Sequence, residues 1–180
     1  MALTAKPTTS DLLVERRLEM AAVFFTFAVL FHNFDHLRRG SDTLSMDVFV
    51  AGSLAMILEV GVVALIFMRH RLAPIAAVSA GFSLAAGYLF VHFTPGRAWL
   101  SDSFVSESVS AVSRIAASME SLAALALGLA GWYALRQRGL EAAASGPPAK
   151  KSFTEVVRSP VVAAMIIGNA LIFVLTIIDF

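Results

Sequence analysis

Residues 46–68 read MDVFVAGSLAMILEVGVVALIFM, an almost unbroken apolar run with only two charged side chains, Asp47 and Glu59. A helix of about 20 predominantly apolar residues is long enough to cross the hydrocarbon core of a bilayer, which is about 30 Å thick. The run therefore predicts a transmembrane helix. Comparable apolar runs predict four further spans, over residues 18–38, 73–93, 107–135 and 159–179.

The composition supports lipid as the solvent for most of the chain. Apolar residues make up 58% of its 180 residues and charged residues 15%, whereas a soluble domain has about 45–50% and about 25%. The 14 basic and 13 acidic residues nearly cancel, so we expect no nucleic-acid partner. Because the chain has no cysteine, any metal must be held by histidine, carboxylate or carbonyl groups.

We therefore predict an all-α polytopic membrane bundle with five transmembrane helices. Lys and Arg concentrate in cytoplasmic segments of membrane proteins, and a cytoplasmic N-terminus places ten basic residues inside and three outside. The inner ten are Lys6, Arg16, Arg17, Arg69, Arg71, Arg136, Arg138, Lys150, Lys151 and Arg158, and the outer three are Arg38, Arg39 and Arg97. With five spans, the C-terminus then lies outside. We expect the chain to be integral to a bacterial plasma membrane.

The chain divides into four predicted parts. Residues 1–17 form a polar cytoplasmic tail, 18–135 a four-helix bundle, 136–158 a flexible cytoplasmic linker, and 159–180 a separate transmembrane helix. The linker contains Gly146-Pro-Pro148, a sequence typical of a connection. The detached last helix suits docking in a homo-oligomer or on a partner membrane subunit.

The first span carries polar residues at a depth where they are unexpected. Its apolar core, Met20–Phe31, is twelve residues long and rises only about 18 Å as a helix. The helix must therefore continue through His32-Asn-Phe-Asp-His36 before it leaves the membrane. His32 and His36 are four apart and share one face, with Asp35 beside them. Two histidines at this spacing can bind a single metal ion.

Helix direction brings further polar residues to the same outer side. The third span runs in the same direction as the first and carries His92 near its outer end, with Tyr88 one turn earlier on the same face. The following connection contains Asp102, and the fourth span is predicted to begin at Glu107. Histidines and carboxylates are thus expected to converge at one depth.

Our leading hypothesis is a metal centre at this outer face. Asp35 or Glu107 is expected to be a fourth ligand or to orient an imidazole, and Glu107 or Asp102 to act as general base. The metal is a divalent transition metal, namely zinc, copper or iron, and the substrate is an apolar molecule or a lipid. The three nitrogen ligands would be His32, His36 and His92.

Buried polar residues deeper in the bundle form a second predicted feature. The fourth span carries a polar stripe of residues three or four apart, in which Arg114 is expected to pair with Glu59, Glu107 or Glu120. The stripe would line a cleft that descends from the outer surface and is closed below by Glu59 and Glu120. Its members are Glu107, Ser110, Arg114, Ser118 and Ser121.

Three other functions fit the same residues. A haem b with His92 and either His32 or His36 as axial ligands would make the chain an electron-transfer or quinone-reactive subunit. A small transporter could use Glu59 and Arg114, together with Glu120, as a site in the middle of the membrane. An accessory subunit of a larger membrane complex would need no ligand of its own.

Overall fold

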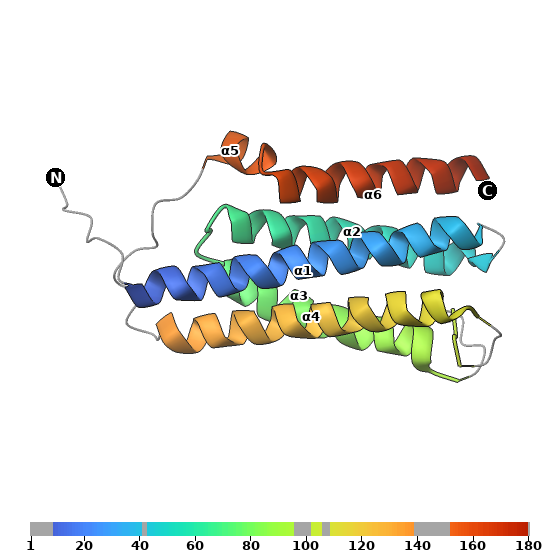
Figure 1. Ribbon diagram of the computed structural model, residues 1–180, viewed down its shortest axis with the longest axis horizontal. Coiled ribbons are helices and arrows are strands. Elements are labelled where there is room, and N and C mark those ends of the chain that lie inside the picture. Colours follow the sequence, from blue (N-terminus) through green and yellow to red (C-terminus); the bar gives the residue numbers. More distant parts are fainter. Residues whose placement is uncertain (1–8, 41–42, 96–101, 106–108, 139–151, 180) are drawn as a thin grey trace.

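The computed structural model describes residues 9–40, 43–95, 102–105, 109–138 and 152–179, and these ranges contain helices and connections but no strand. Four long helices lie side by side along the long axis, and a shorter pair packs alongside them (Figure 1). The helices are α1 (Thr9–Arg39), α2 (Met46–Phe67), α3 (Ala73–Phe93), α4 (Ala111–Arg138), α5 (Phe153–Val157) and α6 (Pro160–Asp179). The prediction of an all-helical bundle is confirmed.

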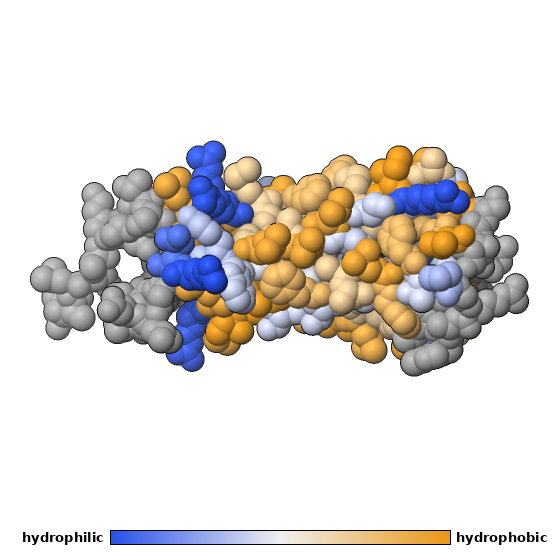
Figure 2. All heavy atoms as spheres, turned by 90° about the horizontal axis from the view of Figure 1, so that it is seen from below, coloured by the Kyte–Doolittle hydropathy of each residue, from blue (hydrophilic) through white to orange (hydrophobic). Residues whose placement is uncertain are grey.

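Four of these helices are long and apolar enough to cross a membrane, and they correspond to the first four predicted spans. Helix α6 contributes a shorter apolar stretch, Pro160–Ile172. An apolar belt lies between two ends that carry the most hydrophilic side chains (Figure 2). The chain is thus a helical membrane protein, while the fifth span and the orientation of the two termini stay predictions.

Helix boundaries differ from the predicted spans in three places. Helix α1 begins at Thr9, within the predicted polar tail, because a helix can extend beyond the apolar part that lies in lipid. Helix α4 begins at Ala111 rather than at residue 107, since the Ser110 side chain accepts a hydrogen bond from the Ser113 amide and caps the helix there. The predicted linker contains the short helix α5, which a capping box between Ser152 and Glu155 begins. Residues 139–151 of that linker lie outside the described residues.

Small residues bring α3 and α4 into close contact, with Ala77 and Gly81 of α3 facing Gly131 and Gly128 of α4. A Cβ atom added to Gly81 would lie 2.4 Å from the Gly128 backbone nitrogen. A Cβ atom added to Gly131 would lie 2.8 Å from the Cβ of Ala77. Only glycine permits such an approach, so these glycines set how closely α3 and α4 pack.

The helix directions define two ends of the bundle. Helices α1 and α3 end where α2 and α4 begin (Figure 1), and we call this the histidine end because all three histidines of the site lie toward it. At the opposite end, Arg69 adopts a left-handed backbone with φ 50°. Its guanidinium binds Glu15 at 3.2 Å and Glu19 at 3.1 Å, both on α1, which fixes the α2–α3 connection against α1.

Candidate metal centre

Three histidines converge at the histidine end, as predicted. His32 and His36 come from successive turns of α1, and His92 comes from the last turn of α3. Their ligand nitrogens all lie within 4.8 Å of one another. His32 and His92 are each only 3% exposed, so this polar group is enclosed by the bundle.

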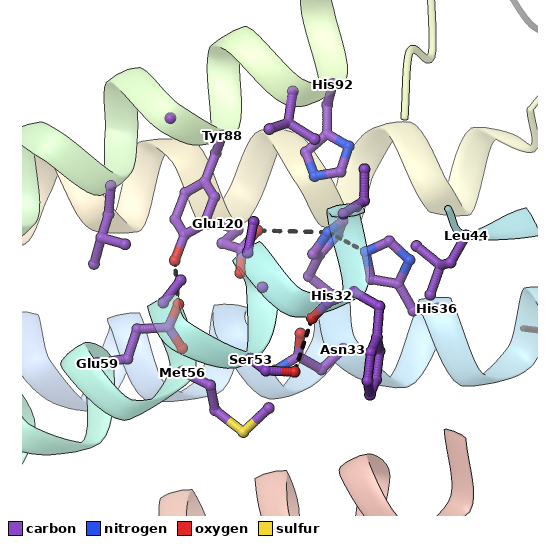
Figure 3. Close-up of a pocket in the computed structure, with 18 of the residues that line it drawn as sticks. His32, Asn33, His36, Leu44, Ser53, Met56, Glu59, Tyr88, His92 and Glu120 are labelled. Carbon is purple, nitrogen blue, oxygen red and sulfur yellow. Dashed lines mark hydrogen bonds and ion pairs between the residues drawn. The ribbon is translucent and has the colours of Figure 1, made fainter. Parts of the chain in front are cut away.

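The three imidazoles face one another closely. The Nε2 atoms of His32 and His36 lie 2.9 Å apart. The centre of the His32 ring lies 4.5 Å from that of His36 and 4.7 Å from that of His92, and the His36 and His92 ring centres lie 6.0 Å apart. Figure 3 shows His92 above His32, with His36 to one side. The arrangement presents several nitrogen donors to one small volume, as a metal site requires.

Asp102 lies directly behind two of the histidines. Its backbone carbonyl accepts a hydrogen bond from His92 Nδ1 at 3.2 Å, and its Oδ2 lies 3.7 Å from the same nitrogen and 3.9 Å from His36 Nδ1. With Nδ1 of His92 so occupied, Nε2 of that ring is left to face the other histidines. A carboxylate and a carbonyl behind a histidine fix its tautomer and orientation, as they do for metal-bound imidazoles.

The segment that carries Asp102 is fixed to the end of α3. The amide of Asp102 donates to the Val91 carbonyl at 3.1 Å, and the amide of Phe104 donates to the His92 carbonyl at 2.8 Å. Arg39 then binds both carboxylate oxygens of Asp102 at 2.8 Å. With both oxygens on a guanidinium, Asp102 is better suited to orienting the histidines than to the predicted role of general base.

Two predicted site residues have other partners or positions. Asp35 is buried, but its Oδ1 accepts hydrogen bonds from Arg38 at 2.9 and 2.8 Å, and it is not part of the three-histidine group. The structure therefore does not bring Asp35 into the ligand set. Glu107 lies outside the described residues.

Arg114 is exposed on α4, so the prediction that it is a buried polar residue is wrong. It is three residues from the start of the helix, where a long basic side chain can reach the membrane surface. Among the described residues, Arg114 makes no ion pair with Glu59 or Glu120. The buried face of α4 instead carries small residues and one carboxylate, Glu120.

Glu120, which the sequence predicts as a buried residue at the lower end of a cleft, lies beside His32. Its Oε2 is 3.6 Å from His32 Nε2, and the side chain is 2% exposed. The sequence signal for this face is the spacing of Ala116, Glu120 and Ala124, which lie four residues apart and so share one side of the helix. Tyr88 donates a hydrogen bond to Glu59 on the side of Glu120 away from His36 (Figure 3). The predicted buried residues Glu59, Glu120 and Tyr88 are thus brought together beside the histidines.

A cavity of about 330 Å³ adjoins this row of polar side chains. Its wall consists mainly of apolar residues from α2 and α3, and its volume is in the range of pockets that hold small molecules. The polar groups that reach it include His32, His36, His92, Glu59, Tyr88 and Glu120. Glu59 and Glu120 both border this cavity, but α2 and α3 form most of its wall, and no described residue of the predicted polar stripe on α4 lines it.

Together the fold and the site define a class, the helical membrane proteins with a buried histidine and carboxylate cluster beside an apolar cavity. Comparison of the chain with protein families, curated proteins and solved structures finds no match. The geometry of the site is therefore the basis for assigning a function.

Proposed function

We propose that this protein holds a transition-metal ion between His32, His36 and His92, and that the ion acts on an apolar molecule bound in the adjoining cavity. One observation carries the proposal. Nitrogen donors from two helices, which are separated by 56 positions between His36 and His92, converge within 4.8 Å in a buried place. Helix packing alone does not require three imidazoles there, because apolar side chains would fill the space at lower cost.

The donor set favours zinc, copper or iron. All three ligands are imidazole nitrogens, which suit these metals, and the chain has no thiolate to compete. Nitrogens around a tetrahedral ion with bonds of about 2.05 Å lie roughly 3.3 Å apart. The 2.9 Å between the His32 and His36 Nε2 atoms therefore needs to change by only a few tenths of an ångström.

Glu120 is the best candidate for the acidic partner of the centre. Its carboxylate lies 3.6 Å from His32 Nε2, which is close enough either to ligate an ion held by that nitrogen or to orient a metal-bound water. Zinc at such a site would supply an activated water for hydrolysis, whereas copper or iron would supply oxidation chemistry. Glu120 replaces Asp102 in the proposed role of base, because Asp102 binds Arg39 through both oxygens.

The spacing of the rings favours an ion over haem. A haem needs two imidazoles on opposite sides of a flat macrocycle. The His32 and His92 ring centres are 4.7 Å apart, and the two rings are inclined at 72°. The third imidazole and Glu120 stand at the same place, so a macrocycle between the two rings would have to displace them.

Elemental analysis of the detergent-purified protein, together with its absorption spectrum, tests the proposal. We expect about one metal ion per chain in the wild type, and loss of that ion in His92→Ala and in the double variant His32→Ala/His36→Ala. His70→Ala is the matched control, because His70 lies in the α2–α3 connection at the opposite end and hydrogen-bonds the Leu72 amide. A folded wild type that takes up no zinc, copper or iron after reconstitution would overturn the proposal.

A further inference from the structure

The cavity has exposed glycines at its edge. Gly52 on α2 and Gly87 on α3 both line it and both are exposed, as is the lining residue Ser83. A Cβ atom added to either glycine would have no neighbour within 4 Å. These residues therefore border open space. Because glycine has no side chain, Gly52 and Gly87 leave an entrance to the cavity between α2 and α3.

This entrance lies within the apolar part of the bundle. Gly52 is six residues after the start of α2 at Met46, and Gly87 is six residues before the end of α3 at Phe93. Because these two helix ends lie together at the histidine end (Figure 1), both glycines are at the same depth, about 9 Å along the helices. Both helices are candidate membrane spans, so the entrance opens toward lipid.

The interior sets the size and character of a ligand. Most of the lining is apolar, including Val48, Phe49, Met56, Leu84 and Ile172. If each non-hydrogen atom takes the roughly 30 Å³ that a water molecule occupies in the liquid, a cavity of about 330 Å³ holds on the order of ten such atoms. The ligand is then much smaller than a whole membrane lipid.

Glu59 adds a polar requirement. The side chain is 3% exposed and reaches the cavity from α2 (Figure 3). One carboxylate oxygen accepts the Tyr88 hydroxyl, while the other, Oε2, has no hydrogen-bond partner among the described residues. A buried acceptor without a donor is costly, so a ligand that donates a hydrogen bond here is favoured. A ligand that carries a carboxylate of its own would instead be disfavoured by the carboxyl groups of Glu59 and Glu120.

We propose that the cavity takes up a small, uncharged alkyl alcohol from the bilayer, through the opening between α2 and α3, and that the alcohol donates its hydroxyl to Glu59. Tyr88 and His92 are one helical turn apart on α3 and both line the cavity, so an alcohol held at Glu59 lies beside the three histidines. This inference deepens the proposed function, because it names the substrate class for the metal centre. Binding of the alcohol itself needs no metal.

Photoaffinity labelling in lipid nanodiscs tests this inference. The probe is an aliphatic diazirine alcohol of about ten non-hydrogen atoms, and the matching diazirine alkane without the hydroxyl is the comparison. We expect saturable labelling of α2 and α3 by the alcohol, competed by 1-decanol, and about tenfold weaker labelling by the alkane. Equal labelling by the two probes would overturn hydroxyl recognition.

Variants test the entrance and the acceptor separately. Gly52→Leu places a side chain in the opening and should reduce labelling at least about fivefold, because overfilling a site excludes its ligand. Gly61→Leu is the matched control, since Gly61 is also an exposed glycine of α2 with no neighbour within 4 Å but does not line the cavity. Equal labelling of Gly52→Leu and Gly61→Leu would overturn entry at this place.

Glu59→Leu should reduce labelling by the alcohol to the level of the alkane, and unchanged labelling would refute the assigned acceptor. If that variant fails to fold, the comparison of alcohol and alkane on the wild type still decides whether the protein recognises the hydroxyl group. All labelling is measured on metal-free and metal-loaded protein. Labelling without any metal uptake would remove the proposed metal centre alone, whereas stoichiometric metal without labelling would remove this inference alone.

Discussion

Asp102→Asn should weaken metal binding without changing any proposed ligand. The substitution keeps the backbone carbonyl that accepts from His92 Nδ1 and keeps the shape of the side chain. It removes a negative charge that lies 3.7 Å from His92 Nδ1 and 3.9 Å from His36 Nδ1. The metal affinity therefore reports how much the charge of this carboxylate contributes to the centre.

The size of the effect follows from the neighbouring charges. A unit positive charge at the position of His92 Nδ1, 3.7 Å from Asp102 Oδ2, would interact with the carboxylate by about 4.5 kcal/mol at an effective dielectric constant of about 20. Arg39 binds the same carboxylate through both oxygens at 2.8 Å and offsets a large part of this interaction. We expect a loss of roughly 1.4–2.7 kcal/mol, or about 10- to 100-fold in affinity, which is the usual range for partners of metal-bound histidines.

Competition titration against a chelator of known affinity measures this change in detergent. Asp47→Asn is the control, because Asp47 is an exposed carboxylate in the first turn of α2 at the same end. Equal metal affinity for Asp102→Asn and the wild type, in proteins that elute identically on size exclusion, would refute the orienting role of Asp102.

Three further predictions concern the ligands and the packing. Lowering the pH from about 8 to about 3, well below the ordinary histidine pKa of about 6.5, should release the metal, because a protonated imidazole cannot bind it. Stabilisation by the metal is then present at the higher pH and lost on acidification, which thermal unfolding with and without metal measures. Equal metal content at about pH 8 and about pH 3 would exclude histidine ligands. Gly81→Leu should destabilise the bundle by about 1–3 kcal/mol or more, because even a Cβ atom there meets the Gly128 backbone at 2.4 Å, whereas Gly61→Leu should be neutral or stabilising in the same unfolding assay. Asn169→Leu should reduce stability by about 0.6 kcal/mol, because it removes the 2.7 Å hydrogen bond from Asn33 that joins α6 to α1; unchanged unfolding would show that this bond does not hold α6.

The convergence of the three histidines was predictable because it depends on length and direction alone. The apolar core of the first span is too short to cross a bilayer, so α1 had to continue through His32 and His36. Helix α3 runs in the same direction as α1, so its last turn had to bring His92 to the same end. Neither step needs knowledge of how the helices rotate about their axes.

The rotation of α4 was not predictable from its polar residues. Arg114 was expected to face inward because charged groups in lipid are costly, but it is near a helix end and lies exposed. The buried face follows the small residues, Ala117 and Ala124, with Glu120 among them. In this helix, close packing of small residues decides which side faces the bundle. Glu120 is the carboxylate on that side, and it is therefore the polar residue of α4 that reaches the site.

The role of Asp102 depends on how a connection folds, which periodicity does not report. The segment returns to the end of α3 through two backbone hydrogen bonds, and Arg39 then reaches it from the end of α1. Sequence reasoning placed Asp102 on the correct side but could not give its partners. Asp102, which the sequence predicts as a general base, is therefore assigned to orienting the histidines, and Glu120 is proposed as the base.

Charge balance connects the two parts of the site. Asp35 and Asp102 are each bound to an arginine, whereas Glu59 and Glu120 have no arginine or lysine partner among the described residues. A buried carboxylate in a membrane bundle is very unfavourable when it is ionised without compensation, so each of these carboxyls is either neutral or balanced by a cation. A divalent cation held by the three neutral imidazoles would let both carboxyls ionise beside it. The two buried carboxyls are thus placed to compensate the charge of the proposed dication.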